Sequence, residues 1–134
     1  MEYKMQQDFE ICKFSDKEEK IYYEVMIEGK LIRGWGLDTD PDLLGFIDIV
    51  KVKSVKKLII INLSNMSFWD TQGIQLIVEA VANINKKMVK RAGIVGGGNS
   101  LNEDVAREKY KKEFSSGLVP WKDTVQDLIT ELRS

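Results

Sequence analysis

The chain has 134 residues, 43% of them hydrophobic and 31% charged, which is typical of one globular domain with its own core. Twenty basic residues nearly balance twenty-one acidic ones, so the net charge favours neither nucleic acid nor an anionic membrane as a partner. The absence of histidine and the single cysteine, Cys12, exclude an internal disulfide, a structural zinc site and Ser-His or Cys-His nucleophile pairs, which makes an enzyme a less favoured interpretation.

The first third of the chain predicts an antiparallel hairpin followed by a helix. Strands are expected over residues 9–14 and 21–32, and the second alternates apolar and polar residues as a half-buried strand does. The charged segment 15–20 is interpreted as their connector. The pair Asp40-Pro41 predicts a helix start, because Asp caps well and proline fits the first helical position. Apolar spacing carries this helix to about Val50.

The middle of the chain predicts a buried strand and the clearest helix of the sequence. Residues 57–63 are almost continuously apolar, with Asn62 as the only interior polar residue, which favours a central strand. After Asp70, an apolar stripe from Ile74 to Met88 has helical spacing. Lysines at its end complement the partial negative charge of a helix C-terminus.

The last third predicts two short strands and two helices. Residues 92–95 form an apolar strand that a glycine-rich segment ends. Ser100 and Glu103 have the spacing of a capping box, which predicts a helix to roughly Phe114. Residues 118–121 are expected to form a strand, and Asp123 to cap a final helix through Leu132.

This order of elements predicts an α/β fold. Alternating strands and helices favour parallel pairing, and the opening hairpin makes the sheet mixed. We therefore expect a single domain over residues 1–134, with a mixed, mostly parallel four- to five-stranded sheet and about four helices.

The sequence also bears on location. No apolar stretch approaches the roughly 20 residues of a membrane span. Residues 1–10 are polar and lack the apolar core of a signal peptide, and a single cysteine fits a reducing compartment. We therefore expect a cytoplasmic protein that holds neither metal nor cofactor.

The junction between the apolar run and the clearest helix is the main candidate site. It reads Phe68-Trp69-Asp70-Thr71-Gln72-Gly73. In open α/β sheets, binding groups gather where the strands end and the following helices begin. A simpler interpretation is that Asp70 only caps the helix, although this leaves the Thr71 hydroxyl free.

With this junction, the element order resembles the STAS family, which includes bacterial anti-sigma factor antagonists. Members read as an apolar strand, a short turn with an aromatic or apolar residue, then Asp-Ser-Ser/Thr-Gly opening an apolar helix. Residues 58–63 match the strand, residues 66–69 the turn, and Asp70, Thr71 and Gly73 the motif. The resemblance is strongest over residues 58–132 and rests on element order before that.

The resemblance implies a non-enzymatic regulator of transcription. Thr71 stands where such antagonists carry the phosphoacceptor of a serine/threonine kinase that is also the anti-sigma factor, and a phosphatase is a possible second partner. Phe68, Trp69, Asp70, Gln72 and Gly73 are then expected to contact the kinase. A phosphate adds about −1.5 to −2 charges at pH 7, enough to repel a partner that must cover it.

Two departures from the family pattern leave an alternative open. Gln72 stands where a second Ser or Thr is usual, and Thr71 replaces the commoner Ser. Some relatives are not phosphorylated. The chain is then a scaffold or accessory subunit of a stressosome-like or membrane transport complex.

A second alternative rests on Gly96, Gly97 and Gly98, which follow a strand and invite interpretation as a phosphate-binding loop. This segment lacks Gly-x-Gly-x-x-Gly spacing and has no following lysine, so it is a weak candidate for a small nucleotide-binding protein. A flexible turn before a capped helix explains the glycines better.

Overall fold

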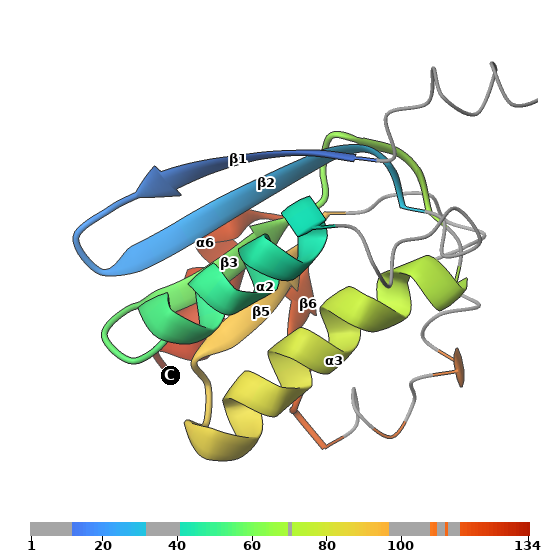
Figure 1. Ribbon diagram of the computed structural model, residues 1–134. Helices are drawn as coiled ribbons and strands as arrows, with labels where there is room; N and C mark the ends of the chain where they lie inside the picture. Colours follow the sequence, from blue (N-terminus) through green and yellow to red (C-terminus); the bar gives the residue numbers. More distant parts are fainter. Residues whose placement is uncertain (1–11, 32–40, 70, 97–107, 110–111, 113–115) are drawn as a thin grey trace, which may run out of the picture.

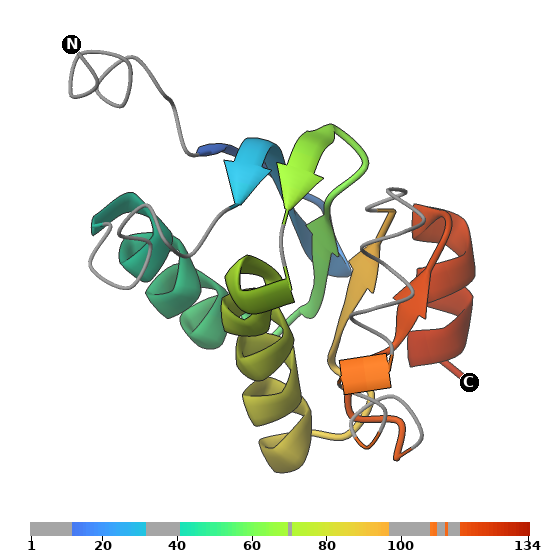
Figure 2. The ribbon, with the colours of Figure 1, turned by 90° about the vertical axis from the view of Figure 1, so that its right-hand side faces the viewer.

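The computed structural model describes residues 12–31, 41–69, 71–96, 108–109, 112 and 116–134, and all structural statements concern these residues (Figure 1). One sheet lies in the middle of the molecule with helices on both of its faces. Figure 2 shows the layers edge-on, with the helices of residues 41–53 and 71–87 on one side of the sheet and the helix of residues 125–132 on the other.

The sheet is mixed and mostly parallel, as predicted. Its path is β1-β2-β3-β5-β6, and β4 pairs with the end of β2 beside this path. Among the described strands, only β1 and β2 pair antiparallel. The strands of the described residues are β1 (Cys12–Glu18), β2 (Tyr22–Leu31), β3 (Leu58–Asn62), β4 (Met66–Trp69), β5 (Ala92–Val95) and β6 (Trp121–Lys122).

The prediction of four to five strands did not include β4, because its residues were interpreted as a turn. Its pairing with β2 shifts register between Gly29 and Lys30, and β4 is only four residues long. A segment of this length carries too little periodicity to be separated from a turn by pattern alone.

Three helices occur within the described residues: α2 (Pro41–Lys53), α3 (Thr71–Lys87) and α6 (Val125–Leu132). The predicted count of about four is therefore corrected to three for this part of the chain. The remaining predicted helix, over residues 100–114, lies mostly outside the described residues, as does the predicted cap Asp40. None of the described helices is long and apolar enough to cross a membrane.

The predicted connector of the hairpin was wrong. Most of segment 15–20 belongs to β1, and the turn is tight, with the Glu19 N–H donating to the Tyr22 carbonyl at 2.8 Å. The charged residues stay in the strand because they have partners: Asp16 accepts from the Tyr23 hydroxyl at 2.7 Å, and Glu18 pairs with Lys53 at 2.8 Å. The predicted strand residues 9–11 lie outside the described residues.

Two boundaries near the C-terminus also differ from prediction. Strand β6 begins after Pro120, which has no N–H for a ladder and offers its carbonyl to the Ile94 N–H at 2.8 Å. The cap of α6 is Thr124 and not Asp123: the Asp127 N–H donates to Thr124 Oγ1 at 3.1 Å. Both Asp and Thr are good caps, so composition did not separate these neighbours.

The predicted burial of the central strand is confirmed. Ile59, Ile60 and Ile61 are fully buried. Ile59 and Ile61 join the larger core cluster, to which α2 and α3 contribute, whereas Ile60 packs with Leu128 and Leu132 of α6. A strand covered on both faces needs apolar residues at every position, which explains its continuous apolar run.

Helix α6 approaches the sheet at Gly93 of β5. A Cβ atom at position 93 would clash with Leu128 Cδ1 and would lie 3.0 Å from the Pro120 carbonyl oxygen. The missing side chain therefore lets α6 lie directly on the strand.

Asn85, near the end of α3, is a buried polar side chain with every hydrogen-bonding position used. Its Nδ2 donates to the carbonyls of Ala92 at 2.9 Å and Leu118 at 2.8 Å. Its Oδ1 accepts from the N–H groups of Arg91 at 2.9 Å and Ala92 at 2.8 Å. An asparagine side chain has two donors and two acceptor sites, so one residue satisfies backbone groups from two separate segments.

We expect Asn85→Ala to lower the free energy of unfolding by roughly 3 kcal/mol, because it leaves several buried backbone groups without partners. Asn83→Ala is the matched control, since Asn83 lies exposed on the same helix. Its effect is expected to stay within about 0.5 kcal/mol. Urea denaturation followed by circular dichroism measures both, and equal effects would contradict this role of Asn85.

Candidate functional site

The candidate site lies at the edge of the sheet where the parallel strands end. Strands β2, β3, β5 and β6 all point toward this edge, and α3 and α6 begin there. Helix α3 opens at Thr71, two residues after the end of β4 (Figure 1). The fold therefore brings the predicted junction to the edge where α/β proteins usually bind.

Hydrogen bonds beyond the strand ends hold this edge together. The Leu63 N–H donates to the Val95 carbonyl at 2.7 Å, and the Gly96 N–H to the Lys122 carbonyl at 3.0 Å. The Trp121 indole N–H donates to the Gly96 carbonyl at 2.7 Å. The turn after β3 is therefore fixed to the ends of β5 and β6.

The structure describes the backbone position of every predicted contact residue except one. Phe68 and Trp69 lie in β4, paired with Lys30 and Leu31 of β2. Thr71, Gln72 and Gly73 form the first positions of α3. Asp70 lies outside the described residues. The backbone thus groups five of the six residues at one edge, and their roles stay predictions.

Helix α3 is well anchored behind its first turn. Ile74 and Ile77 are fully buried in the larger core cluster. The first turn contains no acidic residue. Backbone N–H groups in a first turn have no partner within the helix, and the helix dipole gives that end a partial positive charge. This end of α3 is therefore suited to a negative charge.

Asn62 and Glu24 form a polar pair that the sequence interpretation missed. Asn62 Nδ2 donates to Glu24 Oε2 at 2.9 Å, and Asn62 Oδ1 accepts from the Ser64 N–H at 2.9 Å. Glu24, expected on the polar side of β2, is only 7% exposed. The signal available was Asn62 itself, since a polar residue inside a buried strand needs a partner.

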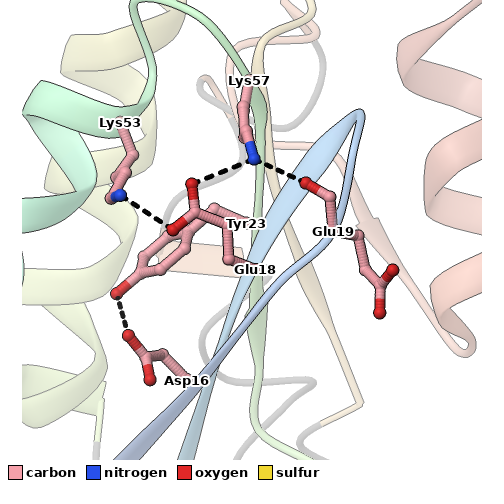
Figure 3. A network of polar contacts seen from close by, with 6 residues as sticks. All are labelled: Asp16, Glu18, Glu19, Tyr23, Lys53 and Lys57. Atoms are coloured by element: carbon pink, nitrogen blue, oxygen red, sulfur yellow. Dashed lines mark hydrogen bonds and ion pairs between the residues drawn. The ribbon is translucent and has the colours of Figure 1, made fainter.

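A second polar network lies where the hairpin meets α2 (Figure 3). Lys57 Nζ donates to the Glu19 carbonyl and lies 2.9 Å from Glu18 Oε2. The contacts that Lys53 and Lys57 make with Glu18 lower the pKa of its carboxyl. Burial and the hydrogen bond to Asp16 raise the pKa of the Tyr23 phenol, which stays protonated. The network therefore attaches the hairpin to the C-terminal end of α2 and to the turn that follows it.

Gly96, predicted as part of a weak nucleotide loop, has a structural explanation. Its φ is +78°, and a Cβ atom there would clash with Ser64 Oγ and lie 2.9 Å from the Ser64 backbone nitrogen. Gly97 and Gly98 lie outside the described residues. The described residues contain no group of three or more potential Asp, Glu or Cys metal ligands.

No family model matches the chain, and no curated protein does either. Solved structures do match. An anti-sigma factor antagonist from Mycobacterium paratuberculosis has a TM-score of 0.63 and 18% identity over 92% of this chain and 95% of its own. The anti-sigma factor antagonist SpoIIAA in its unphosphorylated form has a TM-score of 0.55 and 17% identity over 91% and 99%.

The chain has the fold of an anti-sigma factor antagonist. The predicted STAS-like fold is thereby confirmed. The likeness covers nearly the whole chain and so extends beyond residues 58–132, where the sequence motif was strongest. At this level of identity the fold is what the proteins share.

We expect Gly96→Ala to destabilise the protein more than Gly117→Ala does. Both glycines have a φ of +78°, so both substitutions carry the cost of about 1–2 kcal/mol for a left-handed alanine. Only position 96 is crowded, since nothing lies within 4 Å of a Cβ atom at position 117. Gly96→Ala should therefore lower the free energy of unfolding by about 1–3 kcal/mol more than Gly117→Ala does, an amount typical of overpacking. Equal losses of stability for the two variants in urea denaturation would show that crowding against Ser64 does not add to the cost of Gly96→Ala.

Proposed function

We propose that this chain is a non-enzymatic regulatory protein that docks on an anti-sigma factor with serine/threonine kinase activity, and that Thr71 is its phosphoacceptor. The observation that carries the proposal is the position of Thr71 as the first residue of α3, at the edge where the parallel strands end. The fold shared with two anti-sigma factor antagonists supports it.

The electrostatics of α3 are compatible with such a switch. A phosphate on Thr71 adds about −1.5 to −2 charges at a helix N-terminus, where unpaired N–H groups and the dipole favour an anion. Ile74 and Ile77 keep the helix anchored in the core. Phosphorylation is therefore expected to leave the fold intact and to weaken docking, through repulsion and the cost of burying the phosphate under a partner.

The docking surface in this proposal consists of Phe68, Trp69, Asp70, Gln72 and Gly73. Tryptophan is enriched among residues that dominate binding energy, so Trp69 is expected to contribute most. A phosphatase would reverse the modification. The protein would then regulate transcription in the bacterial cytoplasm.

Gln72 is the observation that favours a second candidate function. An amide replaces the second hydroxyl of the family motif, as expected of a relative that is not phosphorylated. The same surface would then hold the chain permanently in a stressosome-like or membrane transport complex. The nucleotide-binding alternative is not retained, because the turn geometry accounts for Gly96.

The phosphoacceptor is tested by incubating the full chain with candidate anti-sigma factor kinases and ATP, then locating phosphate by mass spectrometry. We expect one phosphate on the wild type and on Thr71→Ser, and none on Thr71→Ala. Thr130→Ala is the matched control, because Thr130 lies exposed on α6 and its loss should not alter labelling. Phosphate retained by Thr71→Ala would disprove the assignment.

Docking is tested separately by titrating the kinase with each variant in the absence of ATP. We expect Thr71→Glu to weaken binding by about tenfold or more, since it adds charge at a surface that must be desolvated. Thr71→Ala and Thr130→Ala should bind like the wild type. A stable complex that Thr71→Glu leaves unchanged would reject the switch in favour of the permanent scaffold.

A further inference from the structure

A cleft of about 420 Å³ lies between the C-terminal ends of α2 and α3. These helices run opposite to the parallel strands that they connect (Figure 1). The cleft is therefore at the far end of α3 from Thr71. Its volume is within the range of clefts that hold small molecules. No function proposed above uses it.

The charge of the cleft is positive. Lys51 of α2 and Lys86 and Lys87 of α3 line it, and no Asp or Glu is among the described lining residues. These lysine side chains have no hydrogen bond or ion pair within the described part of the chain. By contrast, Lys53 and Lys57 nearby are paired with Glu18, at 2.8 and 2.9 Å.

The remaining lining is largely apolar. Val55, in the turn after α2, lines the cleft and is 65% exposed, whereas the valines of the core are buried. Ile84 of α3 and Met88, which directly follows that helix, complete the apolar lining. Ser54 fixes the turn that carries Val55, because its hydroxyl donates to the Lys51 carbonyl at 2.7 Å. The cleft therefore presents cations and an apolar surface together.

Lysines near helix C-termini have a simpler explanation, since they complement the partial negative charge of those ends. This explains why each helix ends in lysine. It does not explain why lysines of both helices line one cleft without a carboxylate, or why an exposed valine lies among them. The combination matches a ligand with both an anionic and an apolar part.

We propose that this cleft binds an anionic amphiphile, a molecule that joins a phosphate or carboxylate to a short apolar chain. The anionic group lies among Lys51, Lys86 and Lys87, and the apolar chain covers Val55, Ile84 and Met88. A free metabolite and the headgroup region of an anionic lipid both offer this chemistry.

The probe is octyl phosphate below its micellar concentration, titrated into the full chain and followed by calorimetry and by amide shifts in NMR. Inorganic phosphate and octanol each supply one half of the ligand. We expect octyl phosphate to bind at least tenfold more tightly than either, with the largest shifts near Val55 and Met88. Equal binding of inorganic phosphate, or shifts elsewhere, would overturn the proposal.

Variants locate the anionic group. Lys51→Gln changes α2 and Lys86→Gln changes α3. If one of these variants folds poorly, the other still tests the contribution of the cleft lysines to binding. Each is expected to weaken octyl phosphate binding by about tenfold, the effect of losing one hydrogen bond to a charged group. Lys56→Gln is the matched control, because Lys56 is an exposed lysine of the same turn that does not line the cleft. Wild-type affinity in both cleft variants would refute the site.

A last comparison identifies the source of the ligand. Vesicles containing phosphatidylglycerol are sedimented with the wild type and with Lys51→Gln. Lysine-dependent binding to vesicles alone supports the site with a lipid headgroup as ligand, whereas binding of the monomer alone supports it with a free metabolite. Failure to bind either, or tighter lysine-dependent binding of an acidic peptide or of DNA, would overturn the proposal.

Discussion

The arrangement of this molecule depends on Asn85, a buried side chain with four hydrogen bonds. It links the last turns of α3 to Ala92 at the start of β5 and to Leu118 before β6. The segment leading to β6 and α6 therefore has a fixed position relative to α3. The other end of α3 is fixed by Ile74 and Ile77 in the core. Both ends of one helix are thus held, and each carries a proposed site.

The two ends of α3 differ in charge because of how helices follow parallel strands. A helix that connects parallel strands returns against their direction, so its N-terminus lies at the carboxyl edge of the sheet and its C-terminus at the opposite edge. Thr71 occupies the first position, where the dipole favours a phosphate. Lys86 and Lys87 occupy the last turn, where lysine side chains suit the dipole and still offer ammonium groups to the cleft. Each proposed site therefore suits an anion for a different reason. At the N-terminus of α3 the backbone supplies the positive character, and at its C-terminus the lysine side chains supply it.

The elements with strong periodicity were predictable, and those that depend on distant partners were not. Strand β5 matched its predicted bounds, β3 is one residue shorter at each end than predicted, and α3 contains the predicted apolar stripe except for Met88. Residues 15–18 were misinterpreted because their charge indicates a loop unless Lys53 and Lys57, far along the chain, are known to pair with Glu18. The same holds for Glu24, whose burial depends on Asn62 of another strand. The local sequence pattern around a residue carries no information on contacts with residues so far along the chain.

The candidate junction illustrates how far a fold constrains a function. Chains that are only 17–18% identical share this arrangement over nine-tenths of their length, so the pattern of burial keeps the fold while most side chains change. The fold places the Thr71 backbone at the start of α3 but does not choose its neighbours. Gln72 is neutral, so it leaves the positive character of the first turn unchanged. It also removes the second hydroxyl of the family motif, and in the proposed switch it confines the phosphate to Thr71.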